Sequence, residues 1–193
     1  MSKITLHKAL KNSYASRDQQ KGAFKNEGFV YDGDLSNDNE QVYYNPNQKK
    51  LLYTVTGTHN LSDWGTDLYG VLGGNLKNTN RYKEASRVLE KAKKRYNPQQ
   101  TSIASHSLGG SISQYIAGKN DKVFTLDKGA TFGQKSRPNE KAYRTSGDLV
   151  SVLNANSKNM TTLKNPNYKT GIFPVDAYLS HNVDNIKKNN IFV

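Results

Sequence analysis

The chain has 193 residues, a formal net charge of +12 and no cysteine. Its length fits one domain with a single core, spanning 1–193, and the missing thiols exclude disulfides, cysteine catalysis and cysteine-based zinc sites. The amino terminus lacks the apolar core of a signal peptide, and no run approaches the roughly 18 apolar residues of a membrane span. We therefore expect a folded, soluble protein, and a cytoplasmic or a virion-associated setting would fit it.

The basic charge has two interpretations. The densest cluster, Lys91–Arg95, falls in an expected helix, where a solvated face is the ordinary outcome. Alternatively, the excess charge attracts a polyanion, such as an anionic membrane surface, nucleic acid or an acidic protein partner. The sequence contains no specific nucleic-acid motif, and it does not define an oligomeric state.

The first third of the chain predicts a short helix and then an antiparallel hairpin. The helix is expected within residues 1–16, and residues 17–40 are interpreted mostly as loop, with a short strand near 29–31. Gln41–Tyr44 and Leu51–Thr56 are β-rich runs on either side of an Asn-Pro turn. The second run is almost entirely apolar or β-branched, which is typical of a strand buried on both faces.

The remainder alternates between helix and strand. Apolar residues at helical spacing predict a helix over 81–96, with Thr79 or Asn80 as its cap. The next expected elements are a strand at Thr101–Ala104, a helix at Gly109–Ala117, strands at Lys122–Leu126 and Ala142–Thr145, and a long loop over 154–169. This order predicts an α/β fold, in which a mostly parallel central sheet follows the antiparallel hairpin.

The segment Ser105-His106-Ser107-Leu108-Gly109-Gly110 carries the candidate nucleophile. It lies between an apolar strand and a helix of small residues, the context of a nucleophile elbow. A serine on such a turn has strained backbone angles, and the new helix points its amino terminus at the site, where it favours a developing oxyanion. The pattern has Ser105 where the motif usually has glycine. On the motif alone, a serine-rich turn without chemistry remains the alternative.

A serine nucleophile needs a histidine base and a carboxylate that orients it. In α/β-hydrolases the chain order is serine, acid, histidine, and His181 is the only histidine after Ser107. Asp148 and Asp127 each follow an expected strand. We favour Asp148, because it lies on the later strand and leads into the loop before His181, and we keep Asp127 as the alternative acid.

The oxyanion hole is expected from two backbone amides. One belongs to Leu108, directly after the nucleophile, and the other to Thr58, in the loop that ends the Leu51–Val55 strand. Trp64, within Asn60–Gly74, is interpreted as lining a substrate pocket or a short lid, with a core anchor as the equally weighted alternative.

Several of these segments together resemble the class 3 (fungal-type) lipases. The segments that carry the resemblance are Thr56-Gly57-Thr58, Asp63-Trp64-Gly65-Thr66-Asp67-Leu68, His106-Ser107-Leu108-Gly109-Gly110, Thr131-Phe132-Gly133, Gly147-Asp148-Leu149-Val150 and His181. They occur in the family's order between Leu51 and His181. Two positions depart from the family pattern: Thr56 stands where arginine is common, and Ser105 replaces the first glycine of the elbow.

The resemblance implies an α/β-hydrolase fold with a minimal lid, because the chain is shorter than typical members. It implies a triad of Ser107, Asp148 and His181, oxyanion donors at Thr58 and Leu108, and neither a metal nor another cofactor. The implied activity is hydrolysis of a carboxylic ester, with a lipid or small ester as substrate. The alternatives are amide hydrolysis by the same triad and a non-enzymatic or packaged component, for example of a viral particle, built on the same fold.

Overall fold

The computed structural model describes residues 3–58, 76–129, 137–154, 157–165, 170, 176 and 179–193. The strands are β1 (Val30–Tyr31), β2 (Glu40–Asn45), β3 (Lys50–Val55), β4 (Gln100–His106), β5 (Lys122–Leu126), β6 (Glu140–Thr145) and β7 (Met160–Leu163). The α-helices are α1 (Leu6–Ser13), α2 (Arg17–Gly22), α4 (Asn80–Tyr96) and α5 (Leu108–Ile116), and the 3₁₀ helices are η1 (Lys25–Glu27), η2 (Leu76–Asn78), η3 (Val152–Asn154) and η4 (Val183–Ile186). No helix in the described ranges is both long and apolar enough to cross a bilayer.

The seven strands form one mixed sheet, in which each strand lies beside its neighbour in sequence. β1, β2 and β3 pair antiparallel, and β3 to β7 pair parallel. The predicted hairpin is therefore β2–β3, and the parallel sheet begins where β3 pairs with β4. The carboxyl ends of the parallel strands consequently share one edge, which is where α/β proteins place their sites.

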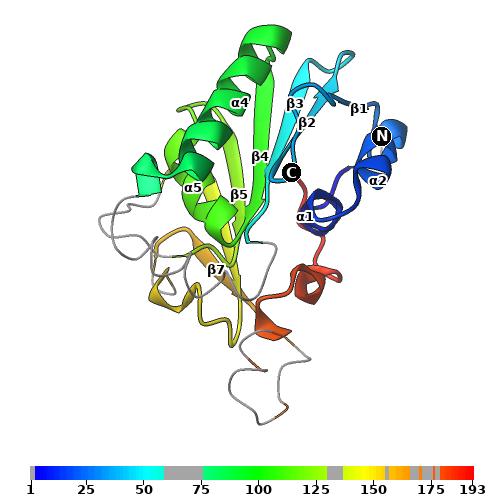
Figure 1. Ribbon diagram of the computed structural model, residues 1–193. Helices are drawn as coiled ribbons and strands as arrows, with labels where there is room; N and C mark the ends of the chain where they lie inside the picture. Colours follow the sequence, from blue (N-terminus) through cyan, green and yellow to red (C-terminus); the bar gives the residue numbers. More distant parts are fainter. Residues whose placement is uncertain are drawn as a thin grey trace.

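Two helices cover one face of this sheet (Figure 1). α4 buries Val88, Leu89 and Ala92 against apolar residues of the sheet, and Ala85 against α5, as the helical spacing predicted. Thr79 caps its start by accepting the amide of Tyr82. α5 is almost entirely buried, because small residues such as Gly109 and Gly110 let it lie directly on the strands.

The other face is covered at its carboxyl end by α1 and the carboxyl-terminal segment (Figure 1). α1 buries Leu6, Ala9 and Leu10, and its amino end forms a bridge between Thr5 and Phe192. Leu52, Ala104 and Phe124 supply the strand side of this core, among other residues. The two termini of the described chain are thereby joined on one face of the sheet.

Two expectations about local structure are wrong. Residues 17–40 were expected to be mostly loop, but Arg17–Gly22 forms α2, whose start carries a capping box made by Ser16 and Gln19. Residues 154–169 were expected to be a loop, but Met160–Leu163 forms β7. This strand lies at the edge of the sheet and is half-buried or exposed, so it has no apolar alternation, and its pairing with β6 decides its structure.

The position of Gly109 sets how closely α5 approaches β3. A Cβ at this position would clash with the backbone carbonyl oxygens of Val55 and Thr56. The oxygen of Thr56 would lie only 2.5 Å from the added Cβ. We expect Gly109→Ala to lower the free energy of unfolding by about 1–3 kcal/mol, measured by urea denaturation. Gly22→Ala is the control, because a Cβ at Gly22 meets nothing within 4 Å. Equal midpoints for the two variants would show that α5 shifts without cost.

Candidate active site

Ser107 lies on the sharp turn between β4 and α5. Its backbone angles are φ 55° and ψ −126°, a region that residues other than glycine rarely adopt. The turn is held on both sides: the Ser107 amide donates to the carbonyl of Leu126 at 3.0 Å, and the Ser107 carbonyl accepts from the Gly110 amide at 2.9 Å. Backbone strain of this kind persists where the surrounding structure enforces it, as at a nucleophile elbow.

The loop after β3 runs directly beside this turn. A Cβ at Gly57 would lie 2.6 Å from the Cβ of Ser107, so the two segments meet only because residue 57 is glycine. Thr58 follows, half-buried. On the other side, Leu108 opens α5, where an amide has no acceptor within its own helix. The two expected oxyanion donors therefore lie on the two segments that flank Ser107.

Arg81, at the start of α4, contacts the loop after β3. Its guanidinium donates to the carbonyl of Thr56 at 2.9 Å and lies 4.0 Å from the carboxylate of Glu40. Burial raises the pKa of Glu40, although the charge of Arg81 opposes that shift. Sequence reasoning did not identify Arg81, which lies on a different element from the Thr56 position where arginine is common in the lipases.

His181 and Asp148 are in direct contact. Nδ1 of His181 lies 2.7 Å from Oδ1 of Asp148, and both side chains are almost completely buried. Asp148 follows β6, and His181 lies just before η4. The His181 ring also lies against that of His106, with centroids 4.6 Å apart, and His106 directly precedes Ser107. Histidine, carboxylate and elbow thus gather at the carboxyl edge of the parallel strands.

The carboxylate of Asp148 is fixed by its own turn. Its Oδ2 accepts from the amide of Ser151 at 2.7 Å and from the Ser151 hydroxyl, and the guanidinium of Arg144 donates to its backbone carbonyl at 3.0 Å. Burial alone would raise the pKa of Asp148, but the hydrogen bonds from His181 and Ser151 outweigh it and lower the pKa. Asp148 is therefore ionised and correctly placed to orient an imidazole.

The same contact acts on His181. Burial lowers its pKa, but the hydrogen bond and the negative charge of Asp148 together raise the pKa above 6.5. A histidine with a raised pKa is a stronger base and holds its second proton more firmly once it has accepted it. This is the electrostatic arrangement that a serine nucleophile requires from its partner.

Asp127 has a different environment from Asp148. It is fully buried after β5, and its carboxyl oxygens contact the amide of Thr145 at 2.6 Å and the Thr145 hydroxyl at 3.0 Å. That hydroxyl also donates to the carbonyl of Ser180, so a protonated Asp127 can donate to its oxygen. Burial, followed by the charge of Asp148, raises the pKa of Asp127 to about 7. Asp127 is therefore partly protonated near neutral pH, and through Thr145 it supports the segment before His181.

His106 and Tyr14 form a second buried pair, which sequence reasoning missed. The Tyr14 hydroxyl lies 2.8 Å from Nδ1 of His106 and accepts the amide of Gly57 at 2.7 Å. Burial, and then the charge of His181, holds the pKa of His106 well below 6.5, so this imidazole stays neutral. Burial likewise raises the pKa of Tyr14. No local sequence pattern ties Tyr14, at the end of α1, to the elbow.

Tyr14 therefore joins α1, the elbow and the loop after β3 through one hydroxyl. We expect Tyr14→Phe to destabilise the fold by about 1–3 kcal/mol, because it leaves the buried Gly57 amide without its acceptor. Thermal unfolding followed by circular dichroism measures the loss. Tyr44→Phe is the matched control, because Tyr44 stacks on Tyr96 and phenylalanine keeps the ring that makes this contact. A Tyr14 variant as stable as the Tyr44 variant would contradict this role.

Among the described residues, His106, Asp127 and His181 form a group whose potential ligand atoms lie within 4.8 Å of one another. Each of these side chains already has a partner in the protein: Tyr14 for His106, Thr145 for Asp127 and Asp148 for His181. The arrangement fits a hydrogen-bonded network better than a cation site. Trp64, the Asn60–Gly74 segment with the expected minimal lid, and Thr131-Phe132-Gly133 lie outside the described residues.

The fold is that of the fungal lipases. The Lip2 lipase of Yarrowia lipolytica superposes with a TM-score of 0.54 at 15% identity, over 81% of this chain and 75% of that one. The Rhizomucor miehei lipase in its propeptide complex gives 0.51 at 15% identity, over 78% of this chain and 62% of that one. A triacylglycerol lipase whose catalytic centre is a serine protease triad superposes with a TM-score of 0.51 at 13% identity, over 75% of this chain and 71% of that one.

The predicted α/β-hydrolase-type sheet of class 3 lipases is thus confirmed. At such identities the likeness establishes the fold alone, and the chain spans less than two thirds of the Rhizomucor enzyme. The sequence matches no protein-family model and no curated protein.

Proposed function

We propose that this protein is a serine hydrolase that cleaves carboxylic esters through Ser107, His181 and Asp148. The observation that carries the proposal is the His181–Asp148 hydrogen bond beside a serine held at positive φ. The raised pKa of His181 and the ionised state of Asp148 agree with the roles of base and orienting acid. The shared fold with lipases adds independent support.

In the proposed reaction, Nε2 of His181 takes the proton of Ser107 as Oγ attacks the ester carbonyl. Asp148 holds the tautomer with the proton on Nδ1 and stabilises the imidazolium that forms. The imidazolium then protonates the leaving alcohol, and an acyl group remains on Ser107. Water, activated by the same imidazole, releases the carboxylic acid and restores the serine. The sequence of steps needs no cofactor.

The oxyanion of each tetrahedral intermediate is proposed to bind the backbone amides of Thr58 and Leu108. The close approach of Gly57 to Ser107 supports this placement, because it brings the loop after β3 to the nucleophile. The amino terminus of α5 adds a favourable dipole at the same place. Removing one donor of such a pair typically costs about 10²–10³ in turnover.

The proposed substrate class is a lipid ester or a small ester. A panel of p-nitrophenyl esters, triacylglycerols, phospholipids and chromogenic peptides tests it. We expect measurable turnover of the esters and none of the peptides. Peptide cleavage without ester cleavage would change the proposed substrate class from esters to amides. A protein inert towards the whole panel would favour the alternative that this chain is a packaged or binding component without enzymatic activity.

The pH dependence follows from the direction of the pKa shift on His181. The base must be neutral to accept a proton, and its pKa lies above 6.5, so kcat/KM should rise with pH and have its midpoint above 6.5. Measuring hydrolysis of a short p-nitrophenyl ester between acidic and mildly alkaline pH checks this. A rate that falls as pH rises through neutrality would contradict His181 as the base.

A further inference from the structure

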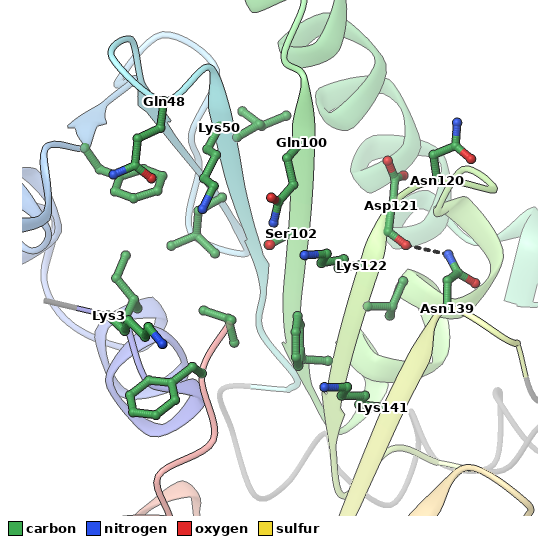
Figure 2. Close-up of a pocket in the computed structure, with 18 of the residues that line it drawn as sticks. Lys3, Gln48, Lys50, Gln100, Ser102, Asn120, Asp121, Lys122, Asn139 and Lys141 are labelled. Carbon is green, nitrogen blue, oxygen red and sulfur yellow. Dashed lines mark hydrogen bonds between the residues drawn. The ribbon is translucent and has the colours of Figure 1, made fainter. Parts of the chain in front are cut away.

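A groove lies at the opposite end of the strands from Ser107. It has a volume of about 640 Å³ and is lined by residues from the amino ends of β3, β4, β5 and β6 together with both chain termini (Figure 2). α1 packs on the same face nearer the site, and Ile4, Phe192 and Val193 from the two chain ends reach the groove. Parallel sheets are normally buried on both faces. At this end the described residues cover the face only in part, because Leu52 and Phe124 are buried whereas Lys122 and Lys141 are exposed.

The strand register places apolar and basic side chains together on this face. Lys50 pairs with Gln100, Ser102 with Lys122, and Phe124 with Lys141, and partners in parallel strands point to the same side. The buried residues Leu52 and Phe124 line the groove. Figure 2 shows the side chains of Lys3, Lys50, Lys122 and Lys141 around it. The groove therefore combines an apolar base with a cationic border.

The positive charge of the border is not neutralised within the described part of the chain. Lys3, Lys50, Lys122 and Lys141 line the groove, and none of them has an ion pair there. The two acids at the groove already have partners elsewhere: Glu27 binds Lys8 at 2.7 Å, and Asp121 binds Lys93 at 2.5 Å. Four lysines without ion pairs in the described part of the chain, beside two paired acids, give the groove a net positive charge, which attracts an anion.

Two of these ammonium groups lie directly over apolar rings. Lys3 Nζ is 5.5 Å from the centroid of Phe192, and Lys141 Nζ is 5.9 Å from that of Phe124. At both places a positive charge therefore lies next to an aromatic ring. Phe192 is 45% exposed, whereas Phe124 is buried. A compact polyanion would leave the Phe192 ring in water, whereas an anionic head on an acyl chain would cover it.

The position of the groove separates it from the proposed ester site. Ser107 lies at the carboxyl ends of the parallel strands and the lysines at the amino ends, so a membrane bound at the lysines would lie far from the nucleophile. The volume falls within the range of pockets for single small molecules, about 300–1,000 Å³. We propose that this groove binds one long-chain fatty acid, its carboxylate among the lysines and its chain along the floor. The binding does not depend on hydrolysis.

The test measures binding of a long-chain fluorescent fatty acid to the full chain, in wild type and in Ser107→Ala. We expect both proteins to bind it, and the fatty alcohol of equal length to bind at least about tenfold more weakly, because it lacks the charge. The double variant K122Q/K141Q should also lose about tenfold in affinity. K91Q/K94Q on α4 is the matched control, with the same change in net charge on the opposite face of the sheet.

A photoreactive fatty acid followed by peptide mapping gives a second readout on wild-type protein, which needs no variant to fold. We expect cross-links in the peptides that contain Lys50, Lys122 and Lys141. Labelling confined to peptides around Ser107 would place the ligand in the ester site and overturn the proposal. So would equal binding of acid and alcohol, or binding only of an acidic peptide. Fatty-acid binding in a protein that is inert towards esters would leave this proposal standing and remove the proposed function.

Discussion

Replacing Ser107 by alanine should lower the turnover of a short p-nitrophenyl ester by about 10⁴-fold or more. Alanine removes the Oγ that forms the acyl intermediate in the proposed reaction. The residual rate would come from the oxyanion donors and from substrate positioning. Steady-state kinetics on purified protein measures the effect, with circular dichroism to show that the variant is folded.

Ser113→Ala is the matched control for this change. Ser113 lies on α5, and its buried hydroxyl has no hydrogen-bond partner among the residues that the structure describes, so its loss should leave turnover within about twofold of wild type. Equal loss of activity in both variants would mean that α5 had been disturbed. If the folded Ser107→Ala variant retained full activity, Ser107 would be excluded as the nucleophile.

Replacing Asp148 by asparagine should lower turnover by about 10⁴-fold. The amide cannot accept the Nδ1 proton of His181 in the same way, so the imidazole adopts the wrong tautomer, and the charge that raises the pKa of His181 is lost. Any residual activity should therefore titrate at lower pH than that of wild type. A pH–rate profile of the two proteins measures both effects.

Asp127→Asn is the discriminating comparison for the acid. Asparagine keeps an oxygen that can accept from the Thr145 amide and an amide group that can donate to the Thr145 hydroxyl, so we expect turnover within about threefold of wild type. If Asp127→Asn abolished turnover and Asp148→Asn did not, Asp127 would be the acid. The sequence favoured Asp148 and kept Asp127 as the alternative, and Asp148 is the carboxylate that contacts Nδ1 of His181.

Much of the fold could be predicted because its signals are local. The apolar Leu51–Val55 run, the helical spacing over 81–96 and the Ser-His-Ser-Leu-Gly-Gly turn each specify their own structure, and the chain order then fixes which side chains meet at the carboxyl edge. His181 could be chosen in this way before its contact with Asp148 was known. Periodicity and topology together were sufficient for these elements.

The remaining features depend on contacts between distant segments. β7 is a polar edge strand that exists through its pairing with β6, and the Tyr14 hydroxyl reaches residues 43 and 92 positions away. Arg81 likewise contacts Thr56 from another element. The groove at the amino ends of the strands arises from register and from incomplete cover, and neither is visible in a sequence pattern.

Mass spectrometry after incubation with a fluorophosphonate probe tests the central claim most directly. We predict a single phosphonyl adduct on the peptide that contains Ser107, formed faster as pH rises and absent from the Ser107→Ala variant. A folded wild-type protein that remains unmodified across this pH range, or an adduct on a different residue, would contradict the assignment of Ser107 as an activated nucleophile.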